Sequence, residues 1–190
     1  MAAVFTDGAC SKNGKKDAQA SYSAVLYHGS TFLVAASGLV EPYKYIDKCA
    51  VDKNQPITPS NNRGEILGVI HGILVLLDIA KLEDDVHEFE IVSDSKITIN
   101  TLAEWLPNRR AAGTAHKLLN MDLLEIAEKY LAELRTYGKV VFTHVHSHVK
   151  EPDGSVRARF LWLGNDLADK AATEIITDPP LEILTTPPLL

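Results

Sequence analysis

The stretch Pro59-Ser60-Asn61-Asn62-Arg63-Gly64-Glu65-Ile66-Leu67-Gly68 marks the change from a polar turn to an apolar helix. From Ile66 to Ile79 nearly every residue is apolar or glycine, which predicts a helix buried on most of its circumference, over about 61–82. Ser60 is placed to cap it. Glu65 lies in its first turns, where a buried carboxylate is costly unless a positive group meets it. The helix dipole alone would also favour an acid there, so other residues must decide the role of Glu65.

The elements around this helix predict an α/β fold. Three strands precede it, at 2–6, 21–27 and 31–36, the last two joined by a turn at His28-Gly29-Ser30. The elements that follow are a strand at 88–92, a helix at 95–106 stopped by Pro107, a helix at 114–137 closed by Gly138 as its C′ residue, a strand at 139–149 and a helix at 163–177. This order predicts a five-stranded mixed sheet, three antiparallel strands and then two parallel, flanked by helices.

Length and composition predict one domain. The chain has 190 residues, 46% of them hydrophobic, which suffices for one buried core but not comfortably for two. We expect the domain to span 1–178, with an insertion without regular structure at 41–59 and a Pro-rich tail at 179–190. Two cysteines offer no disulfide framework, and the longest apolar run, Ile66 to Leu77, is too short for a membrane span. A soluble intracellular chain is therefore expected, with no membrane partner.

The net charge of −6 argues against a protein that binds nucleic acid through charge alone. The acidic excess is concentrated in stretches such as Glu83-Asp84-Asp85 and the region from Asp178 to Glu182. Basic residues flank the polar motifs instead, at Lys12, Lys15, Lys16, Arg63, Lys96, Arg109 and Arg110. A local basic rim around a site is thus compatible with the acidic total.

Four carboxylates are placed so that this architecture could bring them together. Asp7 and Asp94 each follow a predicted strand, and Glu65 and Asp169 lie on helices. Four such groups within a few ångströms would repel or become protonated unless cations were bound. All-oxygen ligands favour Mg²⁺ or Mn²⁺, and two ions about 3.5–4 Å apart stabilise the attacking and leaving oxygens of a phosphodiester displacement. The acids therefore indicate metal-assisted phosphodiester hydrolysis.

The histidines offer a rival chemistry. His144, His146 and His148 occupy alternate positions of the predicted strand 139–149, which places them on one face, where they could ligate zinc. A zinc hydrolase would leave the four acids unexplained.

The chain also resembles a known family, the type 1 ribonucleases H. The matching motifs occur in the family's order over about residues 2–177: Phe5-Thr6-Asp7-Gly8-Ala9-Cys10 with Asn13-Gly14, Ser60-Asn61-Asn62-Arg63-Gly64-Glu65, Ser93-Asp94-Ser95 with Thr98-Ile99-Asn100 and Trp105, His148, and Gly164-Asn165-Asp166-Leu167-Ala168-Asp169. The resemblance implies endonucleolytic cutting of the RNA strand of an RNA–DNA hybrid. It implies that two Mg²⁺ ions, one of which activates a water, are held by Asp7, Glu65, Asp94 and Asp169. Asp169 is chosen over Asp166, three residues earlier, because the family's spacing places the ligand there.

The resemblance also assigns other roles. His148 would assist proton transfer or product release, for which a side chain that changes charge between about pH 5 and 8 is suited. Cys10, Asn13, Asn61 and Asn62 would approach the minor groove of the hybrid, where short polar groups can read the 2′-OH. Ser60 and Asn120 would hold a phosphate of the DNA strand.

This sequence departs from the family in four places, one of which is the insertion at 41–59, whose role the sequence does not reveal. Thr58 stands where some members carry an arginine. The basic handle at 108–117 is short and keeps only Trp105, Arg109, Arg110 and Lys117, so we expect weak, salt-dependent binding. The loop at 150–163, with Arg157 and Arg159, is long enough to close over a substrate.

Two further functions stay open on this sequence. One is a DNA nuclease or junction resolvase on the same fold, and the other is a non-catalytic hybrid-binding module, for which loss of one metal acid would be expected. We expect a monomer. The sequence leaves open whether the chain acts alone or with replication machinery.

Overall fold

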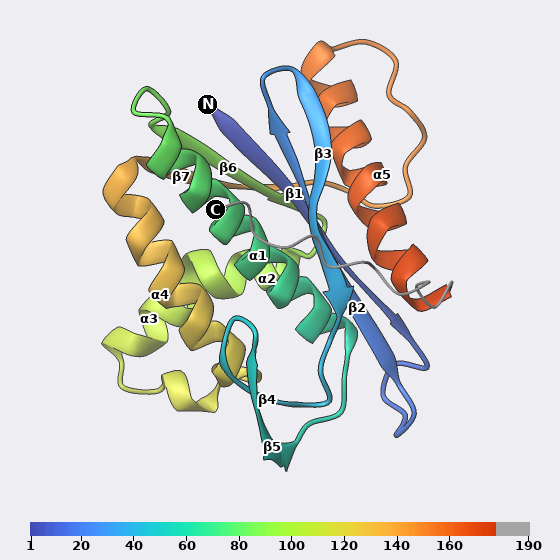
Figure 1. Cartoon of the computed structure of the whole chain (residues 1–190), viewed down its shortest axis with the longest axis vertical. Coiled ribbons are helices and arrows are strands. Elements are labelled where there is room, and N and C mark those ends of the chain that lie inside the picture. Colours follow the sequence, from blue (N-terminus) through green and yellow to red (C-terminus); the bar gives the residue numbers. More distant parts are fainter. Residues whose placement is uncertain (178–190) are drawn as a thin grey trace, which may run out of the picture.

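The computed structural model describes residues 1–177 and contains a five-stranded mixed sheet with helices on both faces (Figure 1). The strand order is β3-β2-β1-β6-β7, with antiparallel pairs among the first three strands and parallel pairs at β1-β6 and β6-β7. The strands span Ala2–Ser11 (β1), Gln19–His28 (β2), Thr31–Leu39 (β3), Glu88–Ser93 (β6) and Lys139–His144 (β7). The predicted fold class is confirmed. The expected tail at 179–190 lies outside the described residues, and the domain boundary at 178 stays a prediction.

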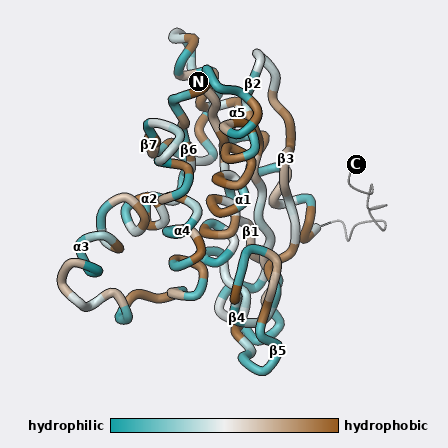
Figure 2. Tube along the Cα trace, turned by 60° about the vertical axis from the view of Figure 1, so that its left-hand side comes forward, coloured by the Kyte–Doolittle hydropathy of each residue, from teal (hydrophilic) through white to brown (hydrophobic). Residues whose placement is uncertain are grey.

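Three long helices cover the sheet, at Asn61–Leu82 (α1), Met121–Tyr137 (α4) and Val156–Thr177 (α5). The larger core lies between α1, α4 and one face of the sheet, and Figure 2 shows apolar residues along most of α1. On the other face α5 covers β1, β2 and β3, and the rings of Phe5 and Phe160 meet edge to face with centroids 5.2 Å apart. Across residues 1–177, no helix combines the length and apolar character that a membrane span requires.

The helix α1 is confirmed as the buried element of the fold. It begins at Asn61, and the backbone N–H of Arg63 donates to the capping hydroxyl of Ser60 at 3.4 Å. Its first turns press against the backbone of β1, because a Cβ added to Gly8 would lie 2.3 Å from the backbone nitrogen of Glu65. Only glycine at position 8 allows this approach, which carries Glu65 onto the sheet.

The strand β1 is longer than predicted. It continues past Asp7 to Ser11, because its antiparallel pairing with β2 persists to the Ser11–Gln19 pair. Its parallel pairing with β6 stops earlier, at Thr6 and Ser93. Asp7 is thus the first residue beyond the shared ladder of the two central strands, and not the tip of its own strand.

The insertion at 41–59 is not irregular as predicted. It contains two antiparallel strands, Tyr43–Asp47 (β4) and Ala50–Pro56 (β5), which form a separate hairpin near the beginning of α1 (Figure 1). The prolines that suggested a loop lie outside the strands or at the end of β5, where a missing N–H costs little. Tyr45 is buried and anchors the hairpin.

The helical region after β6 differs from the prediction at three points. Pro107 does not stop the helix: short α-helices at Lys96–Asn100 (α2) and Leu106–Ala111 (α3) are joined by a π-helical segment at Thr101–Trp105, and Pro107 lies in the first turn of α3, where proline is tolerated. The next long helix starts at Met121 and not at Thr114, after a 3₁₀ turn at Ala115–Lys117. Gly138 has φ 168°, so it is not a left-handed C′ residue. Glycine is needed there because a Cβ would lie 2.1 Å from the carbonyl oxygen of His87.

The last part of the chain also corrects the prediction. The strand β7 ends at His144 and not at Val149, and α5 begins at Val156 and not at Leu163. Arg157 and Arg159 therefore lie on a helix and not on a loop that closes over a substrate. Arg157 pairs with the buried carboxylate of Glu90, and Arg159 pairs with Glu151 at 2.7 Å.

Candidate active site

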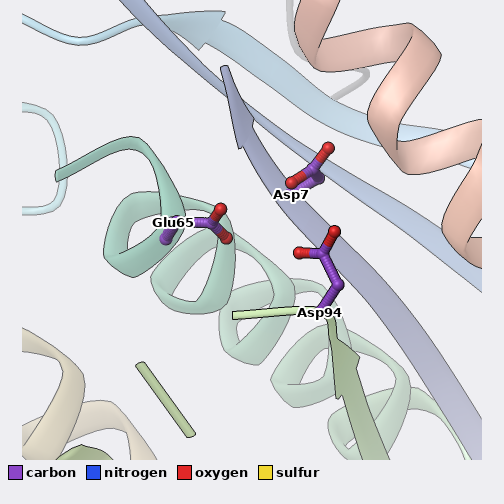
Figure 3. A group of neighbouring side chains, drawn as sticks. All are labelled: Asp7, Glu65 and Asp94. Atoms are coloured by element: carbon purple, nitrogen blue, oxygen red, sulfur yellow. The ribbon is translucent and has the colours of Figure 1, made fainter. Parts of the chain in front are cut away.

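Three of the four predicted acids meet at the end of the β1-β6 ladder. Asp7 comes from β1, Asp94 directly follows β6 and Glu65 comes from the second turn of α1. One carboxylate oxygen from each lies within 4.8 Å of those of the other two. Figure 3 shows the three carboxylates turned toward one another. In residues 1–177 this is the only such group of three or more His, Cys, Asp or Glu side chains.

The fourth acid, Asp169, lines the same hollow of about 580 Å³ as the other three. It is positioned by α5, which is held against β2 because the hydroxyls of Ser21 and Ser23 donate to the carbonyl oxygens of Ala172 and Ala168. Asp166 does not line this hollow and instead forms an ion pair with Lys170 at 2.7 Å. Asp169 therefore lies at the hollow and Asp166 does not, and the assignment of Asp169 as a metal ligand stays a prediction.

Burial and mutual repulsion make the negative charges of these acids unfavourable. Burial raises the pKa of Asp7 from 3.8 to about 8, with further increases from the charges of Asp94 and Asp169 and a decrease from the backbone N–H of Gly8. Burial, and then the charges of Asp7 and Asp94, raise the pKa of Glu65 well above its ordinary value. Burial also raises the pKa of Asp94, whereas a hydrogen bond from Ser147 lowers it. The group therefore favours a bound cation or a bound proton.

The hydrogen bonding of the Glu65 carboxylate leaves one oxygen that could bind a cation. Its Oε1 accepts from the side-chain amide of Asn61 at 3.2 Å, but its Oε2 is buried and has no hydrogen-bond partner in residues 1–177. A buried acceptor without a partner is costly. Hard divalent cations are bound by carboxylate oxygens of this kind. Asp7, Glu65, Asp94 and Asp169 are thus the residues that could hold them.

The histidine row is not formed. Because β7 ends at His144, the three histidines do not share a strand face; the rings of His144 and His146 are near perpendicular with centroids 5.2 Å apart. His148 has φ 53° and lines the carboxylate hollow, whereas His144 Nε2 contacts the carbonyl oxygen of Asp94 at 3.1 Å. The structure thus singles out His148 as the histidine at the site.

Some of the residues predicted to contact the substrate line two neighbouring hollows. Asn61 and Asn62 line the carboxylate hollow, and the backbone N–H of Asn61 donates to Asn13 Oδ1 at 3.3 Å. Cys10 is half-buried and near Asn61 but does not line the hollow. Asn120 lines a second hollow of about 230 Å³, which Asn62 shares. Ser60 caps α1 and lines neither.

One polar residue at the hollow, Ser147, was not predicted from the sequence, whereas Lys96 was expected on a basic rim. Ser147 lies close enough to Asp94 to lower its pKa, and Lys96 brings a positive charge to the rim. Both follow the carboxyl ends of neighbouring parallel strands, β7 and β6, where ligands gather in such sheets. That rule would have found Ser147 had the end of β7 been placed correctly.

The family model described as RNase H matches residues 1–177. The chain belongs to the ribonuclease H family. Members of this family are hydrolytic nucleases, so the carboxylate hollow lies in a nuclease fold. The recognition made from the motifs is confirmed.

Solved structures of ribonuclease H domains share the fold at low identity. Prototype foamy virus protease-reverse transcriptase matches with TM-score 0.61 and 17% identity, over 91% of this chain and 20% of that one. The isolated ribonuclease H domain of PFV matches with TM-score 0.58 and 16% identity, over 91% and 92%. A foamy viral protease-reverse transcriptase in complex with RNA/DNA hybrid matches with TM-score 0.56 and 17% identity, over 91% and 19%. This chain therefore spans about a fifth of the longer viral proteins. No curated protein sequence matches it.

Proposed function

We propose that this ribonuclease H family member cuts the RNA strand of RNA–DNA hybrids with two Mg²⁺ ions, for which Mn²⁺ can substitute. The observation that carries the proposal is the buried carboxylate group: the pKa of Asp7 is raised to about 8, and Glu65 leaves a buried oxygen without a partner. Such a group is unfavourable by itself and becomes favourable around divalent cations.

The four acids share one role in this proposal, and the residues around them have others. Asp7, Glu65, Asp94 and Asp169 hold the ions, which supply positive charge for the phosphate and lower the pKa of the attacking water. Asn61 orients the Glu65 carboxylate, and Ser147 orients that of Asp94. His148, at the rim, accepts or donates a proton as the product leaves. Lys96, also at the rim, offsets the negative charge of an approaching strand.

Recognition of the hybrid is proposed to use the polar residues beside the acids. Asn61 and Asn62 line the hollow, and Cys10 and Asn13 lie next to Asn61, so together they can approach the minor groove and its 2′-OH groups. Ser60 and Asn120 are proposed to hold a phosphate of the DNA strand. The foamy viral neighbour bound to RNA/DNA hybrid supports this class of substrate.

A substrate panel tests the proposal. Hybrid, duplex DNA, duplex RNA and four-way junction are incubated at one salt concentration with Mg²⁺, Mn²⁺ or chelator. Cutting of the RNA strand of the hybrid alone, abolished by chelator, is expected. Preferential cutting of a junction or of duplex DNA would replace the proposal with the DNA nuclease alternative.

A further inference from the structure

The charged side chain of Arg63 is buried deeply beside the candidate phosphate site. It is 1% exposed, and its guanidinium forms two hydrogen bonds to Asp122, at 2.7 and 3.0 Å. Burial works against the charge of Asp122, but hydrogen bonds from Arg63 and from the backbone of Tyr45 lower the pKa of that carboxyl. Charge neutrality is therefore complete between Arg63 and Asp122, and the remaining N–H donors of this buried guanidinium take neutral oxygen acceptors.

One remaining contact fixes the side chain of Asn120. Nη1 of Arg63 donates to Oδ1 of Asn120 at 3.3 Å. An arginine has only donors, so the amide must turn its oxygen toward Arg63 and its nitrogen away. Asn120 lines the second hollow together with Asn62 and Lys117, and its Nδ2 has no hydrogen-bond partner among the described residues. The amide is thus available to donate to an anion.

The side chain of Asn120 is not used to cap the helix that follows it. Asn120 precedes α4 and has φ 58° and ψ 36°, a left-handed conformation that asparagine tolerates better than most residues. An asparagine at this position ordinarily caps the helix with its side chain, but Asn120 makes no such bond. Its side chain is held by Arg63 instead.

The β4-β5 hairpin closes the other side of the Arg63 pocket. The carbonyl oxygen of Tyr43 accepts from Nη2 of Arg63 at 3.3 Å, and the ring of Tyr45 lies 5.6 Å from the guanidinium carbon. The backbone N–H of Tyr45 donates to Asp122 at 3.0 Å. The hairpin therefore excludes water from Arg63 and holds both members of the ion pair.

We infer that Arg63 is a positioning residue that, clamped by the β4-β5 hairpin, aims the Asn120 amide nitrogen at a nucleic-acid phosphate. The inference rests on the proposed function and deepens it, because it gives the inserted hairpin a part in substrate binding. Arg63 acts through Asn120 and does not touch the strand itself.

The first test replaces Arg63 by lysine, which keeps the charge opposite Asp122 but lacks the fork that reaches Asn120 as well. Arg63→Lys is expected to raise KM for the hybrid about tenfold, as for loss of one hydrogen bond to a charged group, and to leave kcat unchanged. Arg157→Lys is the matched control, since it alters another arginine–carboxylate pair on the opposite side of the sheet. It is expected to leave KM unchanged.

A second variant keeps the test decisive if Arg63→Lys folds poorly. Asn120→Gly removes the amide at a backbone conformation that glycine adopts freely, so the fold is kept. It is expected to raise KM about tenfold, as for loss of the same hydrogen bond. Arg63→Lys in that background is expected to add nothing. Additive losses, or an unchanged KM in Asn120→Gly, would overturn the inference.

A spectroscopic readout separates this inference from the proposed function. The side-chain amide of Asn120 is expected to give NMR signals that shift when a hybrid with a 2′-O-methyl RNA strand is added. The same signals are expected not to respond in Arg63→Lys. If the wild-type chain cuts no hybrid, the proposed function fails. The amide response to the hybrid still decides whether Arg63 positions Asn120, and an equal response in both proteins rejects it.

Discussion

Gly64 of α1 and Ser21 of β2 are in contact through backbone atoms, because a Cβ on Gly64 would lie 2.3 Å from the carbonyl oxygen of Ser21. Together with the Gly8 contact, this approach sets the height of Glu65 above Asp7. The active-site geometry therefore depends on two glycines that carry no chemistry themselves.

Gly64→Ala is expected to push α1 away from the sheet. The overpacking should lower the free energy of unfolding by about 1–3 kcal/mol and reduce hybrid cleavage more than hybrid binding. Denaturant unfolding and single-turnover cleavage measure the two effects. Gly113→Ala is the control: its left-handed φ of 69° is strained for alanine, but the added Cβ meets open space, so cleavage should be retained.

The acid group predicts an unusual pH dependence of stability without metal. Asp7 keeps its proton in the folded chain up to about pH 8 but loses it near 3.8 when unfolded, so folding binds a proton between these values. The metal-free protein should lose stability as the pH rises from about 4 to 8, as measured by thermal unfolding in chelator. Asp7→Asn should flatten this slope, and saturating Mg²⁺ should oppose it. The exposed Asp17 is the control position, where asparagine should leave the slope intact.

His148 lines the carboxylate hollow, whereas His146 does not. His148→Ala should therefore lower kcat about 100-fold, the lower end of the range for general acid–base groups, while His146→Ala should leave it nearly unchanged. Steady-state cleavage of a hybrid measures both. Equal effects of the two substitutions would remove His148 from the reaction.

The short basic handle predicts how the affinity for the hybrid depends on salt concentration. Arg110 is bound to Glu128 at 2.8 Å and to Glu125 at 3.5 Å, so its charge holds α3 to α4. Lys117 lines the hollow beside Asn120. Lys117→Gln should reduce the slope of log affinity against log salt by about one, whereas Arg110→Gln should not change it. Binding titrations at several salt concentrations decide between them.

The sequence predicted the sheet because its strands and helices have recognisable local patterns, and it predicted the meeting of the acids because the order of these elements places them at neighbouring ends. The long apolar run after Glu65 indicates a buried helix, the alternation before Asp94 indicates a strand, and the fold class follows from the order of such elements. The hydrogen-bond ladders could not be predicted in the same way. Whether β1 passes Asp7 depends on β2, which lies elsewhere in the sequence.

The main errors arose where a local pattern was misleading. The alternating histidines have the period of a strand, yet the chain leaves the sheet after His144 and reaches His148 in a left-handed conformation. The prolines of 41–59 suggested a loop. In the structure Tyr45 is buried with its ring against the guanidinium of Arg63, so tertiary packing decides the conformation of this segment. The roles of the substrate-binding residues stay predictions.

The most direct measurement of the central claim is cleavage of an RNA–DNA hybrid by wild type and by Asp94→Asn, across a Mg²⁺ titration and with chelator. We expect Mg²⁺-dependent cutting of the RNA strand by the wild type. In the variant we expect a loss of at least about a thousandfold, since metal-assisted charge stabilisation carries most of such a reaction. Calorimetry should show that the variant stays folded. Undiminished cutting by folded Asp94→Asn, or wild-type cutting in chelator, would contradict the claim that these carboxylates hold the ions that drive hydrolysis.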